Sequence, residues 1–330
     1  MLRIFHNTNY DFIKPWRIAL GITIAFYLAG AAAMLVHRGL NYSIEFTGGT
    51  LSQLEFPQPP SVAQIRSAVS AAGFPNAEIQ QFGSNREFTV RAPNISSASD
   101  VNSVATAIEG GLRSSFGTNA PRVVRTEIIG PRVGEELKAN AIKALVLSLI
   151  VVLIFLAFRY DWRFGVAAVI ATAHNLAATI AFMALMNLEV SLTVVAGLLT
   201  VIGYSLNDTI IIFDRVRENL RKARPEPLPQ ALNRAINETL PRSILTHATV
   251  SLAVLALLLF AGEVIRPFSW IMFFGVVTAT FSSIYIAGQV LLWVEHKWPR
   301  KKGDERGPTP RSTKSTPSQP TTPRTPVGAR

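Results

Sequence analysis

The class of fold is decided by residues 139–158, ANAIKALVLSLIVVLIFLAF, in which Lys143 is the only charged side chain. A helix needs about 20 predominantly apolar residues to cross the hydrocarbon core of a bilayer, and this stretch meets that requirement. Five more stretches meet it: Arg17–Val36, Phe164–Met186, Val190–Phe213, Ser243–Gly262 and Phe268–Trp293. We therefore expect an α-helical polytopic membrane protein with six spanning helices.

The composition and the charge distribution fit this class. Only 16% of the 330 residues are charged, against about 25% in ordinary soluble domains. The net charge of +11 comes largely from Lys and Arg before the first helix, between the second and third, between the fourth and fifth, and after the sixth. Basic residues mark the cytosolic side. We expect a multi-pass protein of a bacterial inner membrane with both termini cytosolic, in contact with lipid and not with nucleic acid.

Residues 37–134 differ in kind, because they are polar and rich in turns. Alternating and helical patterns predict six elements in the order β-α-β-β-α-β: Leu51–Phe56, Ser61–Gly73, Ala77–Phe82, Glu87–Ala92, Ala98–Phe116 and Arg122–Ile129. This order is typical of an α+β ferredoxin-like domain. Its place after the first spanning helix predicts a periplasmic or external position. The two glycines Gly48 and Gly49 suit a tight turn or a close backbone contact.

The chain thus divides into four expected parts. Residues 1–36 hold the N-terminal segment and the first helix, residues 37–134 the external domain, and residues 135–298 the other five helices. Residues 299–330 form a basic tail rich in Pro, Ser and Thr, which we expect to be disordered because it cannot bury a core. The second helix follows the last strand directly, so it is expected to transmit movement to the external domain.

Enzymatic chemistry has no support in the sequence. There is no cysteine, and the five histidines lack metal-ligand spacing. We find no nucleophile–base motif and no phosphate-binding loop. The sequence therefore predicts neither an enzyme nor a bound cofactor or metal.

Asp208 is the most informative residue, because it lies inside the fourth expected helix. An ionisable group inside the hydrocarbon core costs about 2.5–3.5 kcal/mol on insertion scales and marks a functional site by default. Thr200, Tyr204, Asn207 and Ile211 recur around it at helical spacing, which predicts a polar stripe facing the bundle interior. Gly197 and Gly203 predict close helix contacts. The aspartate either carries a proton or holds helices together.

Four further residues are candidates for the same site. Arg242 follows Pro241, which suits the first turn of the fifth helix, and its side chain would have to reach inward to Asp208. Thr246 and His247 lie one turn deeper, and His174 lies near the middle of the third helix. Arg242 and the two histidines have plain alternatives, since an arginine at a helix end can be a topology signal and a histidine can be a hydrogen-bonded core residue.

The motifs resemble a known family. Residues 201–219, VIGYSLNDTIIIFDRVREN, are similar to the fourth-helix signature of the SecF family of bacterial protein-export membrane subunits. Residues 41–50, NYSIEFTGGT, and residues 239–246, TLPRSILT, resemble the start of that family's external domain and of its fifth helix. The resemblance runs to about residue 297. It implies half of an RND-type transporter.

The resemblance also implies partners and roles. The partners would be SecD, the SecYEG channel and a translocating preprotein, with the proton gradient promoting export. Asp208 would carry the proton, Arg242 would be its counter-charge, and Thr246 and Asn207 would be polar neighbours in the relay. Asn175 stands where many relatives have aspartate, so no relay role is expected there. Two alternatives stay open: half of a proton-coupled solute efflux transporter, or a scaffold without motor activity.

Overall fold

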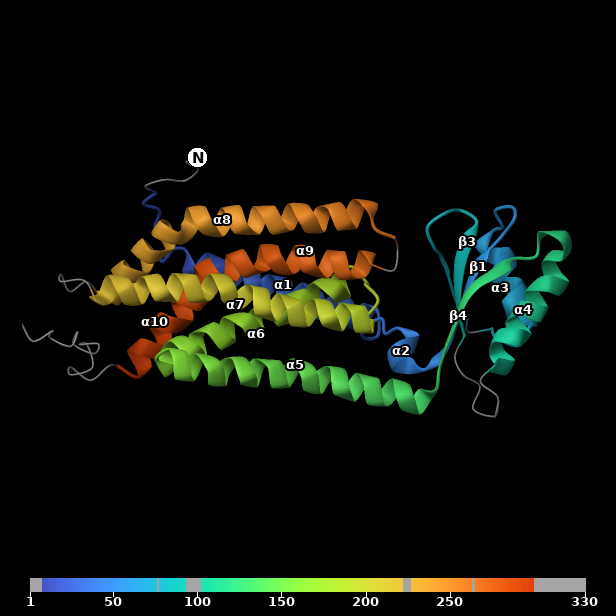
Figure 1. The fold of residues 1–330 in the computed structure, drawn as a ribbon, viewed down its shortest axis with the longest axis horizontal. Helices are drawn as coiled ribbons and strands as arrows, with labels where there is room; N and C mark the ends of the chain where they lie inside the picture. Colours follow the sequence, from blue (N-terminus) through green and yellow to red (C-terminus); the bar gives the residue numbers. More distant parts are fainter. Residues whose placement is uncertain (1–7, 76, 93–101, 222–226, 263–264, 300–330) are drawn as a thin grey trace, which may run out of the picture.

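The computed structural model describes residues 8–75, 77–92, 102–221, 227–262 and 265–299. It consists of a helical bundle and an α+β domain joined at one end of that bundle (Figure 1). We call this end of the bundle proximal and the opposite end distal. The tail after residue 299, which the sequence predicts to be disordered, lies outside the described residues.

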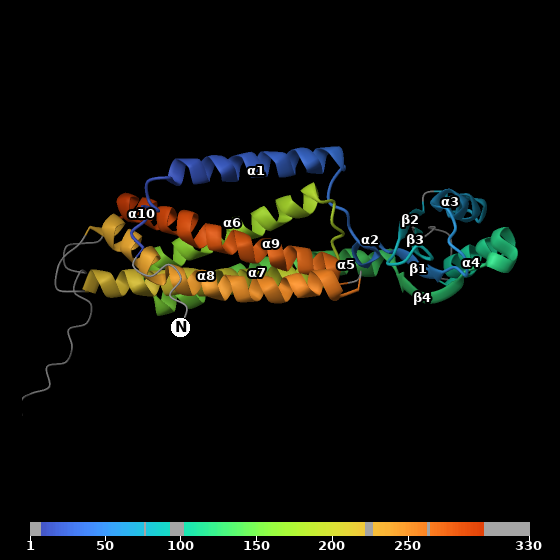
Figure 2. The ribbon, with the colours of Figure 1, turned by 90° about the horizontal axis from the view of Figure 1, so that it is seen from above.

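The six expected spanning helices are confirmed within these residues. They are α1 (Trp16–Val36), α5 (Pro131–Arg159), α6 (Trp162–Leu185), α7 (Leu192–Arg221), α8 (Leu228–Phe260) and a last helix, Arg266–Lys297. The last one consists of α9 (Arg266–Phe281), a π-helical segment (Ser282–Ala287) and α10 (Gly288–Lys297). The most buried helices are α6, α7 and α9, whereas α1 lies at one side of the bundle (Figure 2).

The fifth spanning helix begins earlier than the sequence predicts. Pro241 lies inside α8, so Arg242 does not open the helix, and our prediction was wrong on that point. The additional turns, Leu228–Leu240, form what we call the distal arm, which bends away from the rest of α8 (Figure 1). Leu232 and Ile236 are buried in the core on one face of the arm. The opposite face of the arm is polar. A search for long apolar stretches therefore does not detect the arm, because only one of its sides packs against the apolar core.

The α+β domain has the predicted ferredoxin-like topology. Its elements are β1 (Gly49–Glu55), α3 (Val62–Ala71), β2 (Glu78–Gln81), β3 (Glu87–Ala92), α4 (Asn102–Phe116), a 3-10 turn (Gly117–Asn119) and β4 (Arg122–Ile129). The antiparallel sheet has the strand order β2-β3-β1-β4. Ser61 begins α3 with the predicted N-cap, in a capping box with Gln64. Leu54, Ile65, Val90 and Leu112 are fully buried between the sheet and its two helices.

The domain is joined to the bundle by continuous backbone and by close contacts. Only Gly130 separates β4 from α5, as the idea of a mechanical link requires. The short helix α2 (Ile44–Thr47) leads into Gly48 and Gly49, whose φ angles are 71° and 143°. A Cβ on Gly49 would lie 2.8 Å from the Ala92 carbonyl oxygen, so the glycine pair permits the expected close backbone contact.

A second junction, which the sequence does not predict, lies at the turn between α6 and α7. The Ser43 N–H donates to the Val190 carbonyl at 2.9 Å, and the Val190 N–H donates to the Asn41 carbonyl at 2.7 Å. Arg91 of β3 forms an ion pair with Glu189, and Glu45 accepts a hydrogen bond from the Leu192 N–H at the start of α7. The domain therefore contacts both α5 and the helix that carries Asp208.

Candidate proton-transfer site

Asp208 is a residue of α7, its side chain faces α8, and it is only 4% exposed. The Ser243 hydroxyl of α8 donates a hydrogen bond to its Oδ1. Its Oδ2 is buried and has no hydrogen-bond partner among the described residues. A buried polar atom without a hydrogen-bond partner costs free energy, and such atoms are rare in folded proteins. The unpaired oxygen therefore marks Asp208 as a candidate functional group.

The next turn places a second polar pair beside the first. Successive spanning helices run in opposite directions, so Tyr204 on α7 and His247 on α8 meet one turn nearer the proximal end. Their ring centroids are 5.2 Å apart at an interplanar angle of 60°. The Tyr204 hydroxyl and His247 Nδ1 are also buried without a partner among the described residues. Three buried polar atoms without a partner among the described residues thus occupy neighbouring turns of one helix pair, and each such atom calls for an explanation.

Asn175 and three hydroxyl side chains extend the polar interior to neighbouring helices. Asn175 of α6 is fully buried, and its amide donates to the Ser205 hydroxyl at 2.7 Å. The Thr209 and Ser283 hydroxyls lie 3.0 Å apart. Ser283 belongs to the π-helical segment, a local feature that is frequent at functional sites. The carboxylate is therefore flanked by a hydrogen-bonded layer inside the bundle.

The residues around Asp208 do not form a metal site. Within the described ranges, no group of three or more His, Cys, Asp and Glu side chains comes close enough to hold a metal ion. The polar interior consists instead of hydroxyls, amides, the His247 imidazole and one carboxylate.

Comparison with known proteins places the chain in a family. Residues 112–297 match the family model for the protein export membrane protein SecD/SecF, C-terminal, and residues 33–59 match the SecD/SecF GG motif. A curated relative, the protein translocase subunit SecF of Gemmatimonas aurantiaca, is 57% identical over 305 residues, which cover 91% of each chain. The chain belongs to the SecF family. The SecF of Desulfurispirillum indicum is 43% identical and covers 88% of this chain and 92% of its own.

A solved structure shows the same arrangement. The crystal structure of SecDF from Thermus thermophilus, described as a translocon-associated membrane protein, matches with a TM-score of 0.77 and 36% identity. The match covers 88% of this chain and 39% of that one, so the chain spans about two fifths of the SecDF protein. This chain therefore corresponds in fold to one part of the larger SecDF chain.

Not all of the predicted site residues meet Asp208. Arg242 and Asn207 are exposed, and no ion pair joins Arg242 to Asp208 among the described residues. The Thr246 hydroxyl donates to the Arg242 carbonyl at 2.9 Å and points along its own helix. Ser243 and His247 occupy the positions next to the carboxylate instead. Sequence reasoning missed Ser243, because a single serine in an apolar helix carries no distinctive signal.

Two further predictions need correction. Part of the polar stripe on α7 does not face the interior, since Thr200 and Asn207 lie on the outer surface of this six-helix bundle. A Cβ on Gly203 would meet nothing within 4 Å, whereas a Cβ on Gly197 would lie 3.1 Å from Phe268, so only Gly197 lies at a close helix contact.

His174 faces α1, where its Nε2 lies 3.3 Å from the Thr23 hydroxyl, and the Tyr27 hydroxyl donates to the His174 carbonyl. The structure thus brings His247, and not His174, to Asp208.

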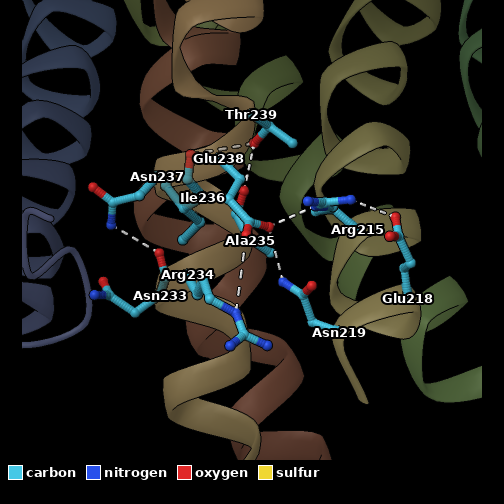
Figure 3. A network of polar contacts seen from close by, with 10 residues as sticks. All are labelled: Arg215, Glu218, Asn219, Asn233, Arg234, Ala235, Ile236, Asn237, Glu238 and Thr239. Atoms are coloured by element: carbon cyan, nitrogen blue, oxygen red, sulfur yellow. Dashed lines mark hydrogen bonds and ion pairs between the residues drawn. The ribbon is translucent and has the colours of Figure 1, made fainter. Parts of the chain in front are cut away.

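A charged network lies beyond the site toward the distal end (Figure 3). Glu238 of the distal arm accepts hydrogen bonds from Arg215 at 2.5 Å and from Asn219 at 3.1 Å, both on α7. Arg215 also donates to Glu218 at 2.6 Å. These contacts thus fix α7 to the distal arm of α8, farther toward the distal end than Asp208.

Proposed function

We propose that this SecF-family chain acts with a SecD-type subunit to couple proton movement to protein export through the Sec translocase. The distal end of the bundle lies in the cytosol, and the α+β domain lies on the periplasmic side of the bacterial inner membrane. The SecYEG channel and the emerging preprotein are its other partners. The role is one of transport and not of catalysis. The names of the relatives, protein translocase subunits SecF and SecDF, support this role over solute efflux.

The buried carboxylate of Asp208 carries the proposal. In the ionised state it accepts a hydrogen bond from Ser243 while its second oxygen has no partner among the described residues. In the protonated state it is neutral and itself becomes a donor. The two states therefore favour different arrangements of α7 and α8, and a proton gradient shifts the population between them. One charge crossing the membrane is worth about 2.3 kcal/mol per 100 mV.

The polar residues on the outside of the bundle suit contact with a second membrane subunit. Thr200 and Asn207 of α7 and Arg242 of α8 lie on the outside of the bundle, close to the site. Facing lipid is unfavourable for such side chains, and they usually meet another helix or water. A SecD-type half covering this face would enclose Asp208 between two halves. Arg242, Thr246 and Asn207 would then belong to the relay through that interface.

The contacts of the α+β domain support mechanical output. A change at Asp208 moves α7. Glu45 accepts a hydrogen bond from the first turn of this helix, and Arg91 pairs with Glu189 in the turn between α6 and α7. The domain is also continuous with α5 through Gly130. The two junctions together couple the bundle to the domain that faces the emerging preprotein.

The decisive experiment replaces Asp208 by asparagine in the assembled complex. Asparagine keeps the size and the hydrogen bond but cannot carry a proton. We expect proton-driven preprotein export into reconstituted vesicles to fall to the level seen without a gradient, while assembly with SecD stays normal. The matched control is Asp214→Asn, the same change on an exposed aspartate of α7. Full export by Asp208→Asn would favour a scaffold, and an efflux defect with intact export would favour the transporter alternative.

A further inference from the structure

The distal arm of α8 and the N-terminal segment meet in a way that the proton-transfer site does not itself explain. Pro241 lies between the arm and the part of α8 that carries Ser243. A proline inside a helix has no N–H for the carbonyl four residues earlier, which here is that of Asn237, and its ring crowds that turn. Such a position is where a helix bends. The arm can therefore swing relative to Ser243 unless other contacts hold it.

Asn233 and Asn237 hold the arm from one side. The two are one turn apart, so their side chains share a face of α8. Asn237 accepts from the Tyr10 N–H and donates to the Tyr10 carbonyl, both at 2.9 Å. Asn233 accepts from the Phe12 N–H at 2.9 Å and donates to the Tyr10 carbonyl at 3.0 Å. Four hydrogen bonds thus bind the backbone of the N-terminal segment.

The segment is itself anchored to a third helix. Phe12 is buried, and its ring centroid lies 6.0 Å from that of Tyr285 in the π-helical segment. The Gln289 side chain of α10 donates to the Ile13 carbonyl at 3.1 Å. The N-terminal segment therefore connects the distal arm to the helix that contains Ser283.

The opposite face of the arm is held by α7. Glu238 bonds to Arg215 and Asn219, whereas Asn233 and Asn237 project away from α7 (Figure 3). The arm is thus fixed on two sides immediately before Pro241. Ser243 follows Pro241 by two residues, so the bend lies directly beside the residue that contacts Asp208.

We propose that Asn233 and Asn237, by clasping the backbone of residues 10–12, are positioning residues of the proton-transfer site. They hold the distal arm at the angle that places Ser243 on Asp208. The N-terminal segment is then a functional part of the site and not only the lead into α1. This inference rests on the proposed function, because it assigns these residues to proton coupling at Asp208.

The test uses Asn237→Ala and Tyr10→Pro in the full-length protein assembled with its SecD-type subunit. The first removes the side chain of the clasp, and the second removes the backbone N–H that it binds. Both are expected to lower proton-driven export about five- to tenfold. A change of this size is what the loss of one or two hydrogen bonds does to an equilibrium between two conformations. Both should also shift the midpoint of the pH profile of export in the same direction as Ser243→Ala does.

A double-mutant comparison separates positioning from general destabilisation. Adding Asn237→Ala to Ser243→Ala should give no further loss, because both changes remove the same contact with Asp208. Gln230→Ala is the matched control, since this amide lies exposed on the same arm and should leave the profile unchanged. Additive losses, or an unchanged pH midpoint in both clasp variants, would overturn the inference. If Asp208→Asn exports normally, the proposed function fails instead, so the two failures are distinguishable.

Discussion

At the scale of single residues, Ser243 is the side chain on which the account of Asp208 rests. Its hydroxyl is the only hydrogen-bond donor to the carboxylate among the described residues. Removing one such bond to a charged group typically costs about 1.5–3 kcal/mol. Loss of the Ser243 hydroxyl would leave both carboxylate oxygens of Asp208 without a partner among the described residues.

Ser243→Ala tests this role. We expect the variant to insert and assemble normally but to lose about tenfold or more of its proton-driven export, because the ionised state loses its donor. The measurement is the export rate in vesicles across a range of pH. The control is Ser251→Ala, at a partly buried serine of the same helix, and it should export at the normal rate. A normal pH profile in Ser243→Ala would remove Ser243 from the mechanism.

The two histidines of α6 and α8 differ in how close they lie to Asp208, which gives a second prediction. His247 packs against Tyr204 beside Asp208, whereas His174 faces Thr23 and Tyr27 of α1. We expect His247→Gln to slow proton-driven export and His174→Gln to leave it within about twofold. Export rates and helix content of the two purified variants check this. Equal losses in both would mean that proximity to Asp208 does not decide the effect.

Some of the site could be predicted from the sequence, for physical reasons that differ by residue. Asp208 stands out because an ionisable group inside an apolar stretch is costly. Ser243 does not, because a serine is tolerated in a membrane helix and only the partner across the helix interface gives it a role. Arg242 was placed beside Asp208 by resemblance, yet in this chain it is exposed.

At the scale of helices, close packing between α7 and α9 depends on Gly275. A Cβ at this position would lie 2.4 Å from the Val201 side chain, closer than any real contact permits. Small residues at such points let membrane helices approach each other. The contact therefore fixes α7 against α9.

Gly275→Ala is therefore expected to destabilise the bundle. Forcing extra volume into a well-packed contact costs typically about 1–3 kcal/mol. Thermal unfolding in detergent should show a lower midpoint for this variant. Gly21→Ala on α1 is the control, since a Cβ there meets nothing within 4 Å. An unchanged midpoint in Gly275→Ala would show that α7 and α9 separate easily.

The helices also show where hydropathy stops being informative. The cores of all six spans were predictable, because their apolar runs match the bilayer thickness. The distal arm of α8 was not, since its buried face comes from a few residues such as Leu232 and Ile236 among polar ones. The π-helical segment, Ser282–Ala287, has no sequence signal that we recognised.

At the scale of the whole molecule, Glu189 links the bundle to the α+β domain in a pH-dependent way. Burial raises the pKa of Glu189 above its ordinary value, while Arg91 opposes that shift and Glu45 and Glu78 add to it. The folded protein therefore holds this proton more tightly than the unfolded chain does. The resulting stability is present at low pH and is lost as the pH rises through the raised pKa.

This sign gives a prediction for docking of the domain. Between the ordinary carboxyl pKa of 4.5 and neutral pH, the wild-type protein should become less stable as pH rises. Glu189→Gln should flatten that dependence, because glutamine does not titrate. Hydrogen exchange at the turn between α6 and α7, compared between the two proteins at several pH values, measures it. The same slope in both proteins would rule out Glu189 as the titrating group.

We propose that protons cross the membrane through Asp208. The test is proton flux into vesicles that contain the complete complex, followed with an internal pH dye under an imposed gradient. We predict that Asp208→Asn reduces the flux to that of protein-free vesicles, whereas Asp214→Asn keeps it. Equal flux through Asp208→Asn and the unmodified complex would contradict the account.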